Sequence, residues 1–287
     1  MNEEKFLSGA NLKKRIDDDI VAEVRRFRDR QIHPTLAVVV PYYDLSCRAY
    51  AESIQNTARK LDILSRIEDI DRDLSEQEIS NRLVRLAADS TVHGVFLELP
   101  TSNGSKSERA LSHIPPQKDI DGLTPTSWGL LLQNRETEAI VSATAQACIE
   151  LAETAGPLKG KHVAVIGTGR TVGRPVWAMA INRGATVTTC NQYTKGLAEK
   201  IKDCEIVIVG IGKPHGIKAE DLHEGQIIID AGINVVGPKT IVGDVDTLSV
   251  IDKVAKITPV PGGVGPVTTA ILFRNLLRAI RLQNGEE

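Results

Sequence analysis

The stretch His162–Pro175, which reads HVAVIGTGRTVGRP, decides the fold of this chain. It begins with a valine-rich run typical of a buried strand, turns on Gly167, Gly169 and Gly173, and continues as a helix. Gly167 permits a sharp turn, Gly169 lets a phosphate approach the backbone, and the N–H groups at the start of the helix favour an anion. The spacing is GxGxxxG rather than GxGxxG, so a purely structural turn is the alternative to a dinucleotide site.

Strands and helices alternate on both sides of this stretch. Helical spacing with a serine–glutamate capping box marks the run SEQEISNRLVRLAADS at 75–90. The strand-like runs are TLAVVVP (35–41), LSRIEDI (64–70), VHGVFLELP (92–100), TVTTC (186–190), IVIVGIG (206–212) and IIIDAGI (227–233). Such alternation predicts an α/β fold built from parallel βαβ units with helices on both faces of each sheet.

Two domains are expected from a length of 287 residues. We predict an N-terminal α/β domain at 1–145 plus 268–287, and a Rossmann-like, doubly wound domain at 146–267. The polar run LLQNRETEAIVSATA (131–145) is the candidate linker. The C-terminal run VTTAILFRNLLRAIRLQ (267–283) is amphipathic with helical spacing, and we expect it to pack back on the first domain.

Composition excludes several classes of function. The chain has 35 basic and 37 acidic residues in mixed order and a net charge of −2, so its sequence lacks the basic cluster expected of a nucleic-acid-binding surface. Its apolar runs are too short to cross a membrane, and its first residues are too charged for a signal peptide. No CxxC or HxxxH spacing occurs, so we expect no metal and a cytoplasmic protein with reduced, buried thiols at Cys47, Cys148, Cys190 and Cys204.

A second glycine-rich segment, PGGVGP, begins at Pro261 and precedes the C-terminal helical run. Pro261 and Pro266 fix φ, while the glycines between them permit backbone angles closed to other residues. A stiff stretch with few side chains suits a loop whose backbone lies against a ligand. A tight turn that only joins two elements is the alternative.

The end of the second strand of the nucleotide-binding pattern does not identify the cofactor. An NAD site usually places an acid there to hold the ribose, whereas an arginine accommodates the phosphate of NADP. Here TVTTC is followed by Asn191 and Gln192, which supply neither group. Arg170 and Arg174 are candidates for hydrogen bonds to phosphate, or are solvated surface arginines. These residues therefore do not distinguish an NAD site from an NADP site.

Taken together, several segments resemble the bifunctional methylenetetrahydrofolate dehydrogenase/methenyltetrahydrofolate cyclohydrolase family over nearly the whole chain. They are LAVVV (36–40), KDIDGLTP (118–125), VIGTGRTVGRP (165–175), IDAGIN (229–234), GDV (243–245) and TPVPGGVGPVTTA (258–270). The resemblance implies a small-molecule folate substrate that carries one carbon on tetrahydrofolate, NADP or NAD as cofactor, and a homodimer. It also implies that PGGVGP belongs to the folate pocket and its cofactor side.

The resemblance further implies a helix with a tyrosine that packs on the folate and, four residues later, a catalytic lysine. A spacing of four places both side chains on one face of a helix. Counting without gaps from Leu36 puts Tyr50 at the tyrosine position and Ile54 at the lysine position. Isoleucine has no proton to give, no charge and no hydrogen bond for a water molecule.

Other positions of the folate site are changed or kept. The family's glutamine in Val-Gln-Leu-Pro is Glu98 here, whose pKa should rise without a cation nearby and allow acid–base chemistry. An ion pair with Arg48, or exposure to solvent, is the alternative. Asp121 would accept two parallel N–H bonds from the pterin, unless it serves only a turn before Gly122. Lys118 would orient Asp121 or lie at the surface.

The chain also departs from the family at two segments. The family's Pro-Cys-Thr-Pro is Ser142–Ala145 here, and the Gly-Arg-Ser that starts its cofactor turn is Gly167–Gly169. We predict a dehydrogenase with weak or no cyclohydrolase activity. Altered one-carbon chemistry through Glu98, or a non-catalytic paralogue that binds folate or nucleotide, are the alternatives. The remaining residues implied are, on the folate side, Pro261, Gly262, Gly263 and Val264 and, on the cofactor side, Gly167, Thr168, Gly169, Arg170, Gly173, Arg174, Gln192, Ile233 and Thr268.

Overall fold

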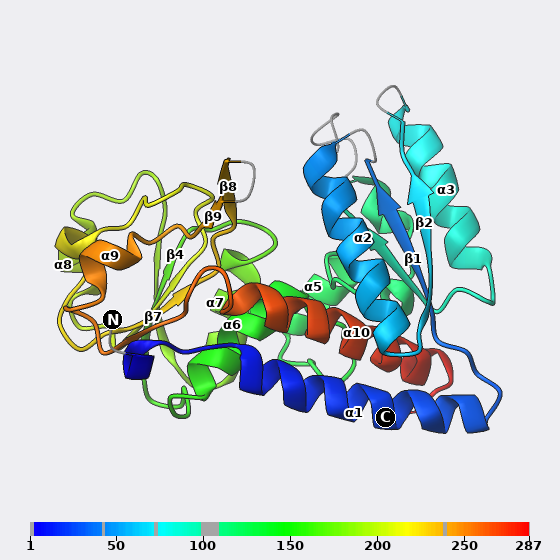
Figure 1. Cartoon of the computed structure of the whole chain (residues 1–287), viewed down its shortest axis with the longest axis horizontal. Coiled ribbons are helices and arrows are strands. Elements are labelled where there is room, and N and C mark those ends of the chain that lie inside the picture. Colours follow the sequence, from blue (N-terminus) through cyan, green and yellow to red (C-terminus); the bar gives the residue numbers. More distant parts are fainter. Residues whose placement is uncertain (1–2, 42–43, 72–73, 99–108, 238–239, 287) are drawn as a thin grey trace. The chain divides into compact units, whose positions relative to one another are not determined.

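The computed structural model divides into two units of contacting residues, each with its own parallel sheet (Figure 1). Unit 1 comprises Met1–Lys14 and Ser142–Ile271, and unit 2 comprises Arg15–Val141 and Leu272–Glu287. The structure describes residues 3–41, 44–71, 74–98, 109–237 and 240–286. The two-domain α/β fold expected from the alternation of strands and helices is confirmed.

The sheet of unit 2 has the strand order β2-β1-β3, with every pair parallel. Its strands are β1 (Thr35–Val40), β2 (Leu64–Asp69) and β3 (Gly94–Leu97). β1 lies in the centre and is almost wholly buried, as its run of valines predicts. Leu99 and Pro100, at the end of the predicted third strand, lie outside the described residues.

Helices follow the strands of unit 2 in the predicted order. They are α1 (Ala10–Asp29), α2 (Leu45–Lys60), α3 (Glu76–Ala88), α5 (Pro125–Leu132) and α10 (Val264–Gln283), with short turns η2 (Leu111–His113) and η3 (Pro116–Lys118). At the start of α3, the hydroxyl of Ser75 accepts the N–H of Glu78 at 3.3 Å, and the Glu78 carboxylate accepts the N–H of Ser75 at 2.8 Å. The predicted capping box is therefore confirmed.

The C-terminal part of α10 packs on the β3 side of unit 2. The side-chain amide of Asn275 donates to the carbonyl oxygens of Ile120 at 2.9 Å and Val141 at 3.1 Å. A Cβ on Gly94 would lie only 2.7 Å from the Leu276 side chain, so strand and helix are in close contact. The predicted return of the C-terminal helix to the first domain is confirmed.

The main sheet of unit 1 has the order β10-β7-β6-β4-β5, again with every pair parallel. Its strands are β4 (His162–Ile166), β5 (Thr186–Cys190), β6 (Ile206–Val209), β7 (Ile227–Asp230) and β10 (Lys256–Ile257). The chain runs outward from β4 in both directions, so the strand order reverses between β4 and β6. This point, at the carboxyl ends of the strands, is where doubly wound sheets bind their ligands.

Helices and a hairpin complete unit 1. They are η1 (Glu3–Lys5), α6 (Ala143–Glu153), α7 (Gly173–Asn182), α8 (Leu197–Ile201), η4 (Ala219–Asp221), α9 (Thr247–Val250) and the antiparallel pair β8 (Asn234–Gly237) and β9 (Thr240–Val242). The four cysteine side chains are buried as reduced thiols. Among the described residues, no helix combines the length and apolar character needed to cross a membrane.

The N-terminal segment corrects one predicted boundary. Residues 1–14 were expected in the first domain, but they make contacts with unit 1. The N–H of Leu7 donates to Ile257 O and the N–H of Gly9 donates to Gly262 O, each at 2.9 Å. The sequence shows a helical pattern from Asn11 onward, and nothing in the few residues before it indicates pairing with a strand some 250 positions away.

Candidate active site

The turn after β4 takes its shape from close backbone contacts that only glycine allows. Gly167 has φ of +101°, and a Cβ there would lie 2.1 Å from the carbonyl oxygen of Gly210. A Cβ on Gly173 would lie 1.9 Å from the carbonyl oxygen of Gly167. Gly169, by contrast, is exposed, and a Cβ there would meet no atom within 4 Å. The turn is rigid at both ends and open at Gly169.

This turn lies at the reversal of strand order. The N–H of Gly167 donates to Cys190 O at 2.8 Å, and the N–H of Gly210 donates to Ile166 O at 2.9 Å, which joins the ends of three neighbouring strands. Among the residues described, no side chain caps the start of α7 at Val172. Free N–H groups at a helix start attract anions. Backbone geometry of this kind suits a phosphate.

A buried carboxylate holds the neighbouring loop, and the sequence reasoning missed it. Asp244 is fully buried. Its Oδ2 accepts the N–H groups of Ile211 at 2.6 Å and Gly212 at 2.9 Å, and its Oδ1 accepts the N–H of Lys213 at 2.9 Å and the side-chain amide of Asn234 at 2.8 Å. Four donors satisfy one carboxylate, so the loop after β6 and the start of the β8–β9 hairpin are held together.

Asp230, at the end of β7, supports Asp244 in turn. Its Oδ1 accepts the N–H groups of Gly232 at 2.8 Å and Asp244 at 3.1 Å, and its Oδ2 accepts the N–H of Val245 at 2.9 Å. Burial raises the pKa of Asp230 to about 6, and the neighbouring charge of Asp244 adds to that rise. The segments IDAGIN and GDV, which contributed only to the resemblance, thus build one buried network.

The PGGVGP segment is shaped largely by contact with the N-terminal segment. Gly262 has φ of +109°, and its carbonyl oxygen accepts the N–H of Gly9. A Cβ on Gly9 would lie 2.3 Å from Gly263 O, and a Cβ on Gly263 would lie 2.6 Å from Pro259 O. These glycines are required by backbone packing within unit 1. The tight-turn interpretation therefore accounts for Gly262 and Gly263 without a ligand.

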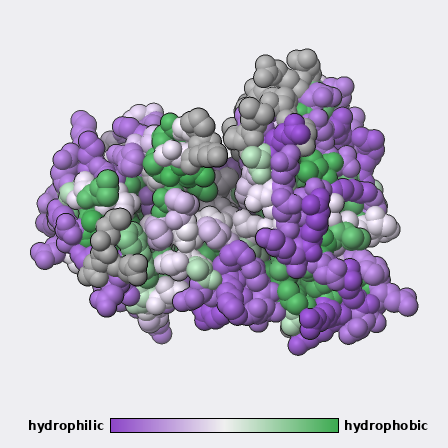
Figure 2. All heavy atoms as spheres, viewed as in Figure 1, coloured by the Kyte–Doolittle hydropathy of each residue, from purple (hydrophilic) through white to green (hydrophobic). Residues whose placement is uncertain are grey.

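The other predicted cofactor residues differ in exposure. Thr168, Arg174 and Gln192 are exposed, and Arg170 is half-buried. Thr268 lies in the first turns of α10, and its hydroxyl donates to Val264 O at 3.1 Å. Apolar side chains are exposed on and beside the β8–β9 hairpin, seen in green beside the β8 position in Figure 2: Ile233, Val235, Val236 and Ile241.

In unit 2, the predicted folate residues Tyr50 and Ile54 both lie on α2, one turn apart. The Tyr50 ring meets Phe96 of β3 edge to face, with centroids 6.1 Å apart and planes at 66°. Ile54 is completely buried. An amine at this buried position would be poorly solvated.

Glu98 follows β3 directly, and its N–H donates to Val39 O at 2.9 Å. Its side chain is largely withdrawn from solvent, and burial raises its pKa to about 8, with the charges of Asp121 and Asp44 adding to the rise. Asp44 lies just before α2, where its carboxylate accepts the N–H of Cys47 at 3.1 Å. Three carboxyl groups from three segments thus influence one another near the end of the central strands.

Arg48 does not take the role of a cation partner for Glu98 that was one alternative. It forms an ion pair with Glu52, one turn along α2, at 3.1 Å. Each of the charges that shifts the pKa of Glu98 is negative, and each raises it. Glu98 is therefore protonated for much of the neutral range, unlike an ordinary surface glutamate.

Lys118 and Asp119 of the KDIDG segment both bond to backbone groups within unit 2. Lys118 is buried, and its ammonium donates to the carbonyl oxygens of Ala87 and Asp89, each at 2.9 Å, where α3 ends. It is neither at the surface nor directed by these bonds to Asp121. The turn before Gly122 is formed by Asp119, whose carbonyl accepts the N–H of Gly122 at 3.2 Å. A charge that caps a helix cannot be told from a ligand-binding charge by sequence alone.

Comparison with known proteins follows the same division of the chain. Residues 7–121 match the family model described as tetrahydrofolate dehydrogenase/cyclohydrolase, catalytic domain, and residues 142–284 match its NAD(P)-binding domain. The chain belongs to the tetrahydrofolate dehydrogenase/cyclohydrolase family. "Bifunctional protein FolD" of Heliobacterium modesticaldum is 38% identical over 282 residues, which cover 98% of each protein. "Bifunctional protein FolD" of Deinococcus radiodurans is also 38% identical, over 99% of this chain and 96% of that protein.

Solved structures of this family share the fold. The bifunctional FolD dehydrogenase/cyclohydrolase from Campylobacter jejuni has a TM-score of 0.91 at 30% identity, covering 98% of this chain and 99% of that chain. The FolD from Trypanosoma brucei, crystallised with NADP cofactor and an inhibitor, has a TM-score of 0.91 at 29% identity, covering 99% of both chains. The nicotinamide-binding fold predicted from the glycine turn is thereby confirmed for the family to which the chain belongs.

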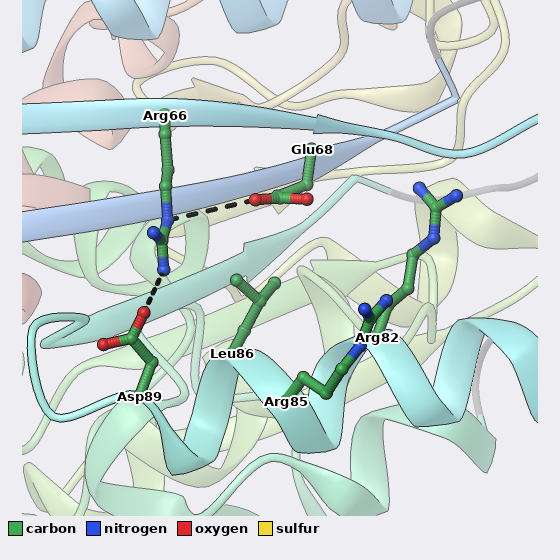
Figure 3. A pocket seen from close by; sticks show the side chains of 6 residues that line it. All are labelled: Arg66, Glu68, Arg82, Arg85, Leu86 and Asp89. Carbon is green, nitrogen blue, oxygen red and sulfur yellow. Dashed lines mark hydrogen bonds and ion pairs between the residues drawn. The ribbon is translucent and has the colours of Figure 1, made fainter.

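A surface hollow of this family member contains none of the predicted site residues. It has a volume of about 210 Å³ and is lined, as Figure 3 shows, by Arg66, Glu68, Arg82, Arg85, Leu86 and Asp89. Arg66 extends from β2 toward Asp89, which it meets at 2.6 Å, and approaches Glu68 at 3.9 Å. Both carboxylates of the hollow thus lie beside Arg66, and we assign it no ligand.

Proposed function

We propose that this protein transfers hydride from the methylene carbon of 5,10-methylenetetrahydrofolate to NAD or NADP, and that it hydrolyses the methenyl product slowly or not at all. The family match over both units, the glycine turn at the switch point and the folate-facing residues support the dehydrogenase activity. Hydride transfer chiefly requires that donor and acceptor lie stacked at contact distance. A fixed backbone can provide that positioning without an acid or a base.

The residues of the chain take separate roles in this proposal. A nicotinamide dinucleotide held at the glycine turn would supply the hydride acceptor. Tyr50, braced by its contact with Phe96, packs against the folate, and Asp121 accepts the pterin's N–H groups as a paired acceptor. Gly167 and Gly169 shape the turn along which the pyrophosphate lies. Each of these roles holds a reactant in place.

The observation that carries the proposed loss of hydrolysis is the buried Ile54. Opening the methenyl ring requires activated water and the movement of protons, and a positioned acid or base contributes about 10²–10⁴-fold to such a step. Ile54, at the position that the resemblance assigns to a lysine, supplies neither. As an apolar side chain, it also offers no hydrogen bond to a water molecule. The two family reactions therefore separate in this chain.

The proposal is tested with two assays of the purified protein. One supplies 5,10-methylenetetrahydrofolate with NAD or NADP, and the other supplies the methenyl compound alone and follows its hydrolysis. We expect turnover in the first and only the spontaneous rate in the second. Ile54→Lys should raise the hydrolysis rate at least tenfold, whereas the matched Ile54→Leu should leave it unchanged. Rapid hydrolysis by the unaltered protein would refute the proposal.

A second candidate function uses Glu98 as an acid or base on a related one-carbon folate. What favours it is the pKa of about 8, which puts the carboxyl close to working pH beside Asp121 and Asp44. Glu98→Gln keeps the shape and removes the titration. This second function is ruled out if the variant retains every measurable activity and its pH profile.

Assembly and location complete the proposal. We take the enzyme to be a homodimer, as the resemblance implies, and to lie in the cytoplasm, as its composition and unpaired cysteine spacing predict. Sedimentation of the purified protein at micromolar concentration tests the assembly, because a sedimenting species of one chain's mass, 31.1 kDa, contradicts it.

A further inference from the structure

The segment after β5 bears on the choice between the two dinucleotides. β5 runs parallel to β4 with Ile166 opposite Cys190, and the N–H of Gly167 donates to Cys190 O at 2.8 Å. The glycine turn and residues 191–194 therefore leave the same edge of the sheet side by side. In doubly wound sheets, a side chain following the second strand contacts the adenosine ribose, where NADP carries its extra phosphate.

The turn in this segment uses some of its polar side chains internally. The side-chain oxygen of Asn191 accepts the N–H of Tyr193 at 2.9 Å. The N–H of Asn191 donates to the hydroxyl of Thr194, also at 2.9 Å. Gln192 and Tyr193 are left exposed, the latter with 81% of its surface accessible. The polar groups that a ribose would meet are therefore a neutral amide and a neutral phenol.

Charge decides between a hydroxyl and a phosphate at this place. A ribose hydroxyl needs one donor and one acceptor, and the amide of Gln192 offers both. A phosphate monoester carries about −1.5 to −2 charges at neutral pH and is bound best by arginine. The cations nearby in the chain are Lys195, which follows the turn, Lys200 on α8, and Arg170 and Arg174 in and after the glycine turn.

We propose that Gln192 is a specificity-determining residue and that the protein takes NAD in preference to NADP. This inference rests on the proposed dehydrogenase function and names its cofactor. Gln192 bonds the ribose hydroxyls, and it leaves the phosphate of NADP without a charged partner. Arg170 and Arg174 lie in the glycine turn and at the start of α7, and in this proposal they serve the pyrophosphate, which belongs there, and not the ribose.

Binding measured by calorimetry, without folate, tests the inference separately from turnover. The full chain should bind NAD at least tenfold more tightly than NADP. Gln192→Arg should tighten NADP binding at least tenfold and change NAD binding less than threefold. Gln192→Glu should bind NAD and reject NADP further. Lys195→Ala serves as the control for a neighbouring cation and should alter neither affinity.

The outcomes separate the two proposals. Equal or tighter binding of NADP by the unaltered chain overturns the inference, as does a Gln192→Arg variant with unchanged NADP affinity. Loss of NADP binding in Lys195→Ala also overturns it, because that lysine would then be the phosphate's partner. If NADP is preferred while 5,10-methylenetetrahydrofolate is still oxidised, only the inference fails. If neither dinucleotide binds, the proposed function fails with it.

Discussion

The glycine turn of unit 1 and the candidate folate site of unit 2 are built in different ways. Around the turn, the functional groups are backbone N–H groups, held by contacts between Gly167, Gly173 and Gly210 and by the buried carboxylate of Asp244. In the candidate folate site, the candidate functional groups are the side chains of Tyr50 and Glu98. A site made of backbone tolerates changes in its side chains, whereas a site made of side chains changes its chemistry with each one.

That difference bears on how the two halves of the chain depart from the residues that the resemblance implies. The turn lacks the Arg-Ser that the resemblance implies, yet the glycines that shape it are present and make close backbone contacts. The folate site keeps Tyr50 and Asp121 but has an isoleucine and a glutamate where the resemblance implies lysine and glutamine. Under the proposed function, positioning survives such exchanges and proton transfer does not.

The largest expected effect is at the turn. Gly167→Ala places a Cβ 2.1 Å from Gly210 O at a φ of +101° and should lower the free energy of unfolding by about 2–4 kcal/mol and abolish dinucleotide binding. Gly169→Ala, in open space, should leave the melting temperature unchanged and weaken dinucleotide binding at least tenfold. Calorimetry and thermal melts measure both. Undiminished binding by Gly169→Ala would show that no phosphate approaches the turn there.

Asp244→Asn should have the next largest effect. The amide cannot accept all four hydrogen bonds that the carboxylate receives, so at least one buried donor loses its partner, at a cost of about 1–3 kcal/mol each. Denaturant unfolding should show a loss of about 2–4 kcal/mol. Asp252→Asn, at an exposed site, is the control. If the two variants are equally stable, the Asp244 carboxylate does not hold the loop after β6 in place.

The pH dependence of stability sharpens the contrast on the folate side. Glu98 has a pKa raised from 4.5 to about 8, so between these values the folded protein binds more protons than the unfolded chain, and the free energy of unfolding falls as pH rises. Glu98→Gln should remove that part of the slope and stabilise the protein above pH 8 by about 1–3 kcal/mol. Melts of both proteins from pH 5 to 9 measure it. Parallel curves would mean that Glu98 is solvated normally.

The smallest effect is expected at Lys118. Lys118→Met removes the two hydrogen bonds to the end of α3 and should lower the free energy of unfolding by about 1–2 kcal/mol. The KM for the folate should stay within twofold of normal, since the ammonium is engaged within unit 2. A tenfold rise in that KM at normal stability would restore the folate-binding role first predicted for this lysine.

The periodic and glycine-based features were predictable because local physics determines them. The capping box at Ser75, the valine-rich central strand and the strand–turn–helix at Gly167 all follow from patterns within a few residues. The roles of Asp230 and Asp244 were not, because their partners lie on loops that only the folded sheet brings together. A buried aspartate and a surface aspartate look alike in sequence.

The same limit applies to the charged residues of the folate unit. Lys118 had a plausible ligand role by type, yet its ammonium donates to backbone carbonyl groups at the end of α3. The predicted domain of the N-terminal segment differs from the observed one because its partners, Ile257 and Gly262, lie far from it in the sequence. The sequence pointed to a changed activity at Ile54 only through the resemblance, because an isoleucine on a helix otherwise indicates a core position.

The most direct test of the separated activities follows all products of one reaction. The purified chain is mixed with 5,10-methylenetetrahydrofolate and an excess of the dinucleotide it binds, and reduced dinucleotide, methenyl and formyl products are quantified from the first turnovers. We predict one methenyl product for each reduced dinucleotide, with formyl product appearing only at the uncatalysed rate. Formyl product that keeps pace with reduced dinucleotide from the start would contradict the account.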